Sequence, residues 1–106
     1  FRNMQLYIIM EIFRPKDGEI TVYSKSGCPG CNNVKKLLTE HHLKHTIIDC
    51  DEFILEDKQT LLYFIETIAG KKCNVFPMVF DGSIFIGGYK ATLQYIDKIL
   101  HFDVSF

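Results

Sequence analysis

The chain has 106 residues, of which 47% are hydrophobic and 24% charged, a composition typical of one globular domain with a single hydrophobic core. Its formal net charge of -1 argues against a nucleic-acid partner, and no apolar run approaches the roughly 20 residues that a membrane helix needs. The first residues lack the layout of a signal peptide. We therefore expect a cytoplasmic monomer without a membrane partner, whose four cysteines are reduced thiols.

The N-terminal part is the least decided by its pattern. Residues 6–13 place apolar side chains on one helix face, but three isoleucines and a tyrosine also suit a buried strand. The turn residues Arg14 to Gly18 then break the chain. We predict one domain with a core of about residues 19–100. Residues 1–18 form an N-terminal extension, for which the pattern does not decide between a helix and a strand.

Two cysteines, Cys28 and Cys31, stand between a predicted strand and a predicted helix. Residues 19–24 form the strand-like run. After the cysteines, Cys31, Val34 and Leu38 recur at the spacing of a helix that buries one face. Cys31 is therefore expected on the inward stripe, whereas Cys28 precedes the helix and is expected to be reached by solvent.

This placement suits thiol chemistry. A sulfur at a helix N-terminus meets unpaired N–H groups and the positive end of the helix dipole, which favour the thiolate. Lys25, shortly before Cys28, adds a positive charge that favours the anion further. A second cysteine one turn later, Cys31, is placed to attack a mixed disulfide formed at the first. The pattern predicts a dithiol redox site.

The next segments predict a strand and a helix. Residues 45–49 form the strand. A helix of about residues 57–69 is expected to bury Leu61, Ile65 and Ile68 and to end at Gly70.

The C-terminal part predicts a hairpin and a last helix. Residues 77–80 and 83–86 are strand-like, and the Asp81-Gly82 pair between them suits a two-residue type I′ turn. After Gly87-Gly88, a helix of residues 91–100 is expected to bury Leu93, Ile96 and Leu100.

The order of strand, helix, strand, helix, hairpin and helix predicts an α/β fold. A right-handed crossover makes the first two strands parallel, and the hairpin adds an antiparallel pair. Helices then cover both faces of a small mixed four-stranded sheet.

With these elements in place, the chain resembles a dithiol glutaredoxin of the thioredoxin-fold superfamily. Three landmarks carry the resemblance in order: Lys25-x-x-Cys28-Pro29-x-Cys31, Pro77 at the start of a strand, and Ile86-Gly87-Gly88-Tyr89 before the last helix. The Cys-x-x-Cys motif is weak alone, but its strand–helix context and the downstream landmarks make it specific.

The resemblance implies both the reaction and its residues. Cys28 would attack glutathionylated or disulfide-bonded proteins, and Cys31 or a second glutathione would resolve the mixed disulfide, with glutathione as cosubstrate. The redox-active disulfide would join Cys28 to Cys31, and Pro77 would follow a cis peptide bond. Glutathione would be bound by Lys25, Phe76, Pro77, Gly87, Gly88, Tyr89 and Lys90, with Lys71 or Lys72 helping Lys25 at its glycine carboxylate.

The sequence departs from the usual glutaredoxin pattern near the expected glutathione site. Gly30 stands where the family commonly has tyrosine or phenylalanine, and Phe76 is bulkier than the usual residue before the proline. Lys90-Ala91 replaces the expected Ser/Thr-Asp pair, so either Thr92 or Lys90 is expected to compensate, the lysine by pairing with a glutathione carboxylate. Tyr89 suits either the core or the groove.

Other functions are considered beside this one. Some glutaredoxins hold a [2Fe–2S] cluster between two subunits through the first cysteine and glutathione, and Gly30 would leave room for one. A thioredoxin-like reductase recycled by a flavoprotein is the other alternative, although the chain contains no tryptophan. We expect no metal site. A tetrahedral zinc site usually combines two closely spaced ligand pairs, and no second pair at the required spacing follows Cys28 and Cys31. The other candidate ligands are His41, His42, His45, Cys50 and Cys73.

Overall fold

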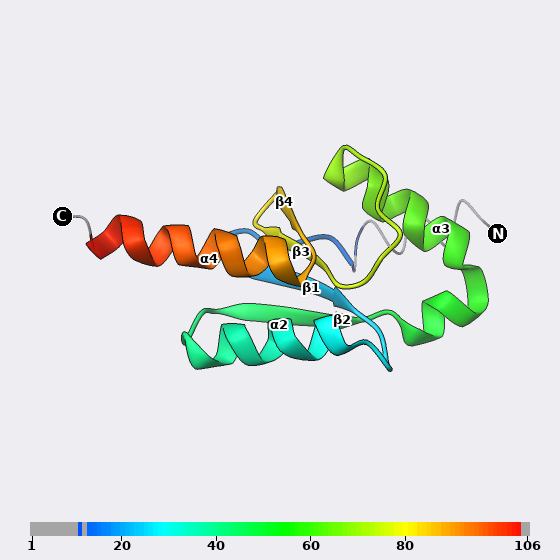
Figure 1. Cartoon of the computed structure of the whole chain (residues 1–106). Coiled ribbons are helices and arrows are strands. Elements are labelled where there is room, and N and C mark those ends of the chain that lie inside the picture. Colours follow the sequence, from blue (N-terminus) through cyan, green and yellow to red (C-terminus); the bar gives the residue numbers. More distant parts are fainter. Residues whose placement is uncertain (1–10, 12, 105–106) are drawn as a thin grey trace.

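A four-stranded mixed sheet forms the centre of the computed structural model (Figure 1). The structure describes residue 11 and residues 13–104, with only the helical backbone for 101–104. Most of the segment 6–13, for which a helix or a strand was expected, lies outside the described residues, namely residues 6–10 and 12. In chain order the elements are β1 (Ile20–Ser24), α2 (Pro29–Glu40), β2 (His45–Asp49), α3 (Asp51–Ala69), β3 (Met78–Asp81), β4 (Ile84–Gly87) and α4 (Tyr89–Val104).

The sheet has the predicted mixture of parallel and antiparallel pairs, in the order β2-β1-β3-β4. β1 and β2 are parallel, with Ser24 opposite Asp49 at their C-terminal ends. β3 runs antiparallel to both β1 and β4. The C-terminal end of β1, where the cysteine loop begins, therefore lies beside the C-terminal end of β2.

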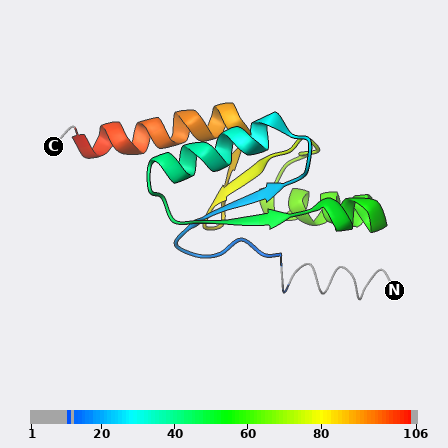
Figure 2. The ribbon, with the colours of Figure 1, turned by 90° about the horizontal axis from the view of Figure 1, so that it is seen from below.

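The helices cover both faces of the sheet, as predicted (Figure 2). Alternate residues of β1 point to opposite faces. Ile20 and Val22 belong to an apolar cluster with α2 and α4, whereas Tyr23 belongs to a cluster with α3. The α3 cluster also contains Cys28 and Cys31, so the cysteines are packed into the core of the domain.

The hairpin is present, but its predicted turn is wrong in position and type. Asp81 pairs with Ile84, so the connecting residues are Gly82 and Ser83 rather than Asp81 and Gly82. Gly82 has φ +56 and is the one of the two with a positive φ. A type I′ turn requires positive φ at both positions, whereas type II′ requires it at the first. Asp81 stays in the strand, where its carboxylate accepts a hydrogen bond from the Tyr95 hydroxyl.

Helix α3 begins earlier than predicted and bends at the predicted start. Asp57 has non-helical φ -157 and ψ 73 inside the helix. Its carboxylate accepts hydrogen bonds from the amide of Thr60 at 3.2 Å and from the hydroxyl of Thr60 at 2.6 Å. Asp57 therefore caps a second helical segment, which is the one the sequence pattern revealed. The first segment, 51–56, was missed.

The buried face of α4 also differs from the prediction. Leu93 and Leu100 are 42% and 36% exposed, whereas Ile96 is buried as expected. The buried position beside Ile96 is Thr92, whose hydroxyl donates a hydrogen bond to the carbonyl of Gly88 at 2.7 Å. Because this bond satisfies the hydroxyl, a polar side chain occupies the core face that apolar spacing alone assigned to the leucines.

Among the described helices, none is long and apolar enough to cross a membrane.

Candidate active site

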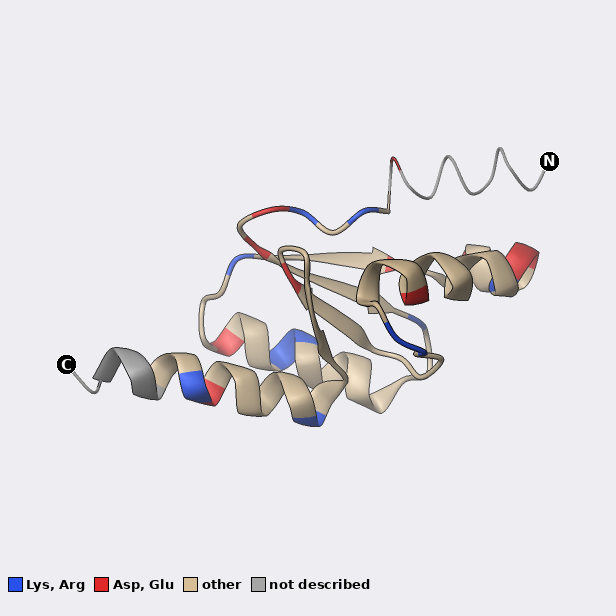
Figure 3. Ribbon diagram, turned by 90° about the horizontal axis from the view of Figure 1, so that it is seen from above, with Lys and Arg blue, Asp and Glu red and all other residues tan. Residues whose placement is uncertain are grey.

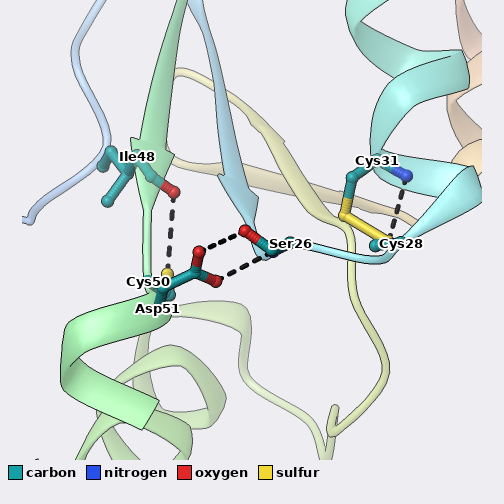
Figure 4. The surroundings of a disulfide bond; sticks show 6 residues. All are labelled: Ser26, Cys28, Cys31, Ile48, Cys50 and Asp51. Carbon is teal, nitrogen blue, oxygen red and sulfur yellow. Dashed lines mark hydrogen bonds between the residues drawn. A yellow bond between two sulfur atoms is a disulfide. The ribbon is translucent and has the colours of Figure 1, made fainter. Parts of the chain in front are cut away.

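The two cysteines of the Cys-x-x-Cys motif form a disulfide at the start of α2 (Figure 4). Their Cα atoms are 5.2 Å apart. Cys28 is the N-cap residue with an extended backbone, and Pro29 takes the first helical position, where its missing N–H leaves no bond unmade. The amide of Cys31 donates a hydrogen bond to Sγ of Cys28 at 3.1 Å. The helix terminus therefore directs a donor at the first sulfur.

Solvent access to Cys28 is smaller than predicted. In the disulfide form Cys28 is 6% exposed and Cys31 is fully buried. The inward position of Cys31 is confirmed, and the open position of Cys28 is not, because Cys28 packs into the same apolar cluster as Phe76 and Met78. Cys28 is still the more exposed residue of the two.

The Phe76–Pro77 peptide bond is cis, as the family resemblance implied. Pro77 lies against the first turn of α2: a Cβ on Gly30 would stand 3.1 Å from Cδ of Pro77. Gly88 approaches the same segment, since its Cβ would lie 3.8 Å from the carbonyl oxygen of Pro77. The structure thus brings the three sequence landmarks together from distant parts of the chain.

The glycine pair is placed at the junction of β4 and α4. Gly87 has φ +130, a conformation that favours glycine, and a Cβ there would stand in tight contact with Cβ of Ala91 at 3.0 Å. Lys90 is exposed in the first turn of α4. Tyr89 is half-buried and packs against the α2–α4 cluster, where it lines a small hollow with Asn33 of α2.

Lys25 lies in the loop between β1 and Cys28 and reaches toward the proline segment. Its Nζ is 5.6 Å from the centre of the Phe76 ring, a cation–π contact. Lys71, one of the two alternatives for the glycine carboxylate, places its Nζ 5.7 Å from the Phe85 ring. Figure 3 shows that basic and acidic positions are scattered along the described ribbon.

Sequence reasoning missed an acidic residue that supports the cysteine loop. The carboxylate of Asp51 accepts hydrogen bonds from the amide of Ser26, at 2.8 Å, and from its hydroxyl. These bonds lower the pKa of Asp51. The available signal was its position just after the second strand, since parallel neighbours bring their C-terminal ends together.

The remaining cysteines are free thiols. Burial raises the pKa of Cys50 to about 12, and the carboxylates of Asp49 and Asp51 act in the same direction. Cys73 is half-buried. Its pKa is raised as well, mainly by burial and to a smaller extent by the Glu66 carboxylate. Both are therefore poor nucleophiles at neutral pH. Among the described residues, no three metal-ligating side chains gather into a candidate metal site.

The chain is similar to known proteins in sequence. A family model described as Glutaredoxin matches residues 20–86. Glutaredoxin 1 of Rickettsia felis is 31% identical over 86 residues, which cover 76% of this chain and 79% of the relative.

Solved structures with the same architecture include two plant proteins. The holo form of glutaredoxin C1 from Populus tremula x tremuloides has a TM-score of 0.68 and 27% identity, covering 92% of this chain and 82% of its own. A buckwheat glutaredoxin–glutathione complex has a TM-score of 0.63 and 22% identity, covering 92% and 83% of the two chains. The latter likeness supports the fold alone. The likeness to the Populus structure shows the thioredoxin fold that the resemblance to glutaredoxins implied, and the observed sheet is the mixed four-stranded sheet predicted from the element order.

Proposed function

The chain belongs to the glutaredoxin family, and on that premise we propose that it is a glutathione-dependent thiol–disulfide oxidoreductase acting through Cys28 and Cys31. Family and fold together make it a thiol–disulfide oxidoreductase. The dependence on glutathione and the tasks of single residues are the parts that we propose.

The observation that carries the proposal is the position of the Cys28 sulfur. This sulfur caps α2 and accepts a hydrogen bond from the Cys31 amide at 3.1 Å. It is joined to Cys31 in a disulfide. After reduction, the same amide and helix terminus favour a thiolate at this sulfur. Cys31 is fully buried and so suits the resolving role.

Reduction of a glutathione mixed disulfide takes two exchanges. The Cys28 thiolate attacks the glutathione sulfur, forms a Cys28–glutathione disulfide and releases the protein substrate as a thiolate, which takes up a proton. A second glutathione thiolate then attacks the glutathione sulfur of that intermediate, which yields glutathione disulfide and restores the Cys28 thiolate. The reaction consumes one free glutathione, and the other half of the glutathione disulfide comes from the substrate.

Reduction of a protein disulfide uses both cysteines. Cys28 attacks one substrate sulfur and releases the other as a thiolate. Cys31 then attacks Sγ of Cys28, which frees the second substrate thiolate and leaves the Cys28–Cys31 disulfide. Two glutathiones reduce this disulfide in turn.

Glutathione is proposed to bind between the proline segment and the start of α4. The backbone of Phe76 before the cis bond offers strand-like pairing, and Gly87 and Gly88 leave room for close backbone approach. Lys25, exposed above Phe76, suits the glycine carboxylate, and exposed Lys90 suits the γ-glutamyl carboxylate. Membership of the glutaredoxin family supports this ligand class. Tyr89, packed against α2, is proposed to border the site only through its backbone.

The free thiols of Cys50 and Cys73 are the reason to propose a reducing compartment, the cytoplasm, as the site of action.

The decisive experiment is a coupled assay with glutathione, glutathione reductase and NADPH on a small glutathione mixed disulfide. Cys28→Ser should abolish turnover, whereas Cys31→Ser should keep mixed-disulfide reduction and lose protein-disulfide reduction. Cys73→Ser, which changes a thiol outside the site, is the matched control and should behave as wild type. Full activity of Cys28→Ser would overturn the assignment of the nucleophile, and turnover only with a flavoprotein thioredoxin reductase would overturn glutathione dependence.

A further inference from the structure

The loop that delivers Cys28 to the helix is tied to a different element, the start of α3. Residues 25–27 connect β1 to Cys28, and Ser26 lies at their middle. The backbone amide of Ser26 donates to one oxygen of the Asp51 carboxylate at 2.8 Å, and the Ser26 hydroxyl donates to the other. Figure 4 shows Ser26 between Asp51 and the disulfide. We call this pair of hydrogen bonds the Ser26–Asp51 clamp.

The Asp51 side of the clamp is itself fixed by the sheet. The amide of Cys50 donates to the carbonyl of Ser24 at 2.9 Å, which continues the parallel pairing of β1 with β2 past its last residues. The amide of Asp51 donates to Oδ1 of Asp49 at 2.9 Å. Asp51 also stands in the first turn of α3, where a negative charge is favoured by the helix dipole. The anchor therefore has a defined position before it meets the loop.

The charges around the carboxylate keep it ionised. The two hydrogen bonds from Ser26 lower the pKa of Asp51 most, and the Asp49 hydrogen bond and the Lys35 ammonium of α2 act in the same direction. An ionised carboxylate accepts both bonds from Ser26, whereas a protonated one has lost part of its acceptor strength. The clamp is thus complete at neutral pH.

We infer that Asp51 is a positioning residue for glutathione substrates, acting through Ser26 on Lys25. This inference rests on the proposed function. Lys25 is adjacent to Ser26, and its ammonium lies 5.6 Å from the centre of the Phe76 ring. The clamp fixes the backbone on one side of Lys25, and β1 fixes it on the other side through buried Ser24. The Lys25 side chain is therefore directed at the proline segment before a ligand arrives, which reduces the ordering entropy lost on binding.

The clamp lies at the surface, and this separates a positioning role from a structural one. Ser26 is exposed, and both of its bonds to Asp51 are exposed to solvent. Exposed polar contacts contribute little to global stability. Loss of the clamp should therefore leave the fold intact and act on the loop.

The kinetic consequence is a change in binding rather than in chemistry. Asp51→Ala should raise the KM for a glutathione mixed disulfide roughly fivefold, the effect expected for losing one well-placed polar contact, with kcat within about twofold of wild type. Asp51→Asn keeps an oxygen for the Ser26 amide and an amide group for its hydroxyl, so it should restore most of the wild-type KM. Glu52→Gln removes a charge from the same helix turn without touching the loop and is the matched control.

A second measurement does not depend on activity. Hydrogen exchange of the Ser26 amide, followed by NMR, should be slowed in the wild type and in Glu52→Gln and accelerated in Asp51→Ala, while amides of β1 stay protected. Ser26→Ala removes only the hydroxyl bond and should give a smaller rise in KM with a partly protected amide. It also serves as the test variant if Asp51→Ala does not fold.

The outcomes separate the two proposals. If the wild type is active with glutathione and both Asp51→Ala and Ser26→Ala keep its KM, the positioning role is overturned while the proposed function stands. If kcat falls and KM does not change, Asp51 acts on the chemical step and the inference is also overturned. If the wild type does not turn over glutathione mixed disulfides, the proposed function fails, whatever the Ser26 amide shows.

Discussion

Gly30 lies against Pro77, so that a Cβ on Gly30 would stand 3.1 Å from Cδ of the proline ring. Pro77 leads directly into β3, whose first three residues are buried, so the ring has little freedom to move aside. The position that commonly carries an aromatic side chain in glutaredoxins is thus held in this chain by a glycine in close contact with the proline segment.

Gly30→Ala should therefore disturb the site more than the fold. Alanine gains up to about 1 kcal/mol of helix propensity, and a tight contact with a fixed neighbour costs about the same, so the free energy of unfolding should change by less than about 1 kcal/mol. The kcat/KM for a glutathione mixed disulfide should fall several-fold, because Phe76 and Pro77 are displaced. Urea unfolding and steady-state kinetics measure the two effects.

Asn33→Ala, at an exposed position of the same helix, controls for helix propensity. A Gly30→Ala protein that gains the full stability of the control and keeps its kinetics would show that the proline segment yields without consequence.

Lys25→Ala should weaken substrate binding through loss of one exposed charge. A surface charge pair contributes at most about 1 kcal/mol, which corresponds to a rise in KM of at most roughly fivefold. Lys25→Arg should keep most of the binding, because it retains the charge and the contact with the Phe76 ring. The KM values for a glutathione mixed disulfide at low and high salt measure this, and the difference should shrink at high salt.

The control for this prediction is Lys44→Ala. Lys44 lies just before β2, at the end of the sheet opposite Lys25, and its Nζ is 3.6 Å from a carboxylate oxygen of Glu19. A KM that responds equally to both substitutions would point to net charge rather than to Lys25.

Burial of Cys50 predicts a loss of stability in alkaline solution. Its pKa is raised to about 12 in the folded protein, above that of an exposed thiol. Between the two values the unfolded chain releases the Cys50 proton and the folded protein retains it, so stability is full below the unfolded pKa and falls as the pH rises. The expected contribution is a loss of about 2 kcal/mol between pH 8 and pH 10.

Urea unfolding of the disulfide form of wild type and Cys50→Ala across this pH range isolates the contribution, because both proteins share the other titrating groups. Identical pH slopes for the two proteins would mean that Cys50 ionises as readily in the folded state as in the unfolded state.

Asp57 is predicted to stabilise the second segment of α3 by capping it. Asp57→Ala removes the acceptors for both Thr60 bonds and should lower the free energy of unfolding by about 1 kcal/mol, the usual effect of losing such a cap. Asp57→Asn should recover most of this, and Glu56→Ala, at an exposed neighbouring position, should change stability little. Equal unfolding midpoints for Asp57→Ala and Glu56→Ala would contradict the cap.

Local patterns in the sequence predicted much of the frame of this protein. The second strand was predicted at its observed bounds, and the stripe of Cys31, Val34 and Leu38 is buried. Such elements can be predicted because the spacing of apolar residues over a short segment indicates a strand or a helix without reference to the rest of the chain. The cis bond before Pro77 came from the family resemblance and is confirmed.

Predictions failed where a polar side chain has a hydrogen-bond partner that the apolar pattern does not describe. Thr92 occupies the core face of α4 because the Gly88 carbonyl accepts a hydrogen bond from its hydroxyl. Leu93 and Leu100 therefore lie on the exposed face of the helix. Asp81 remains in β3 instead of starting the turn, with Tyr95 of α4 bound to its carboxylate. Apolar spacing contains no information about such pairs.

The sequence alone determined that a cysteine pair opens a helix after a strand and that a proline and two glycines follow downstream. The tertiary structure decided which of these residues meet: Gly30 lies against Pro77, and Ser26 binds Asp51. The physical reason is register. Ser24 and Asp49 are paired at the ends of two parallel strands, so the residues that follow each strand are brought side by side although they are far apart in the chain.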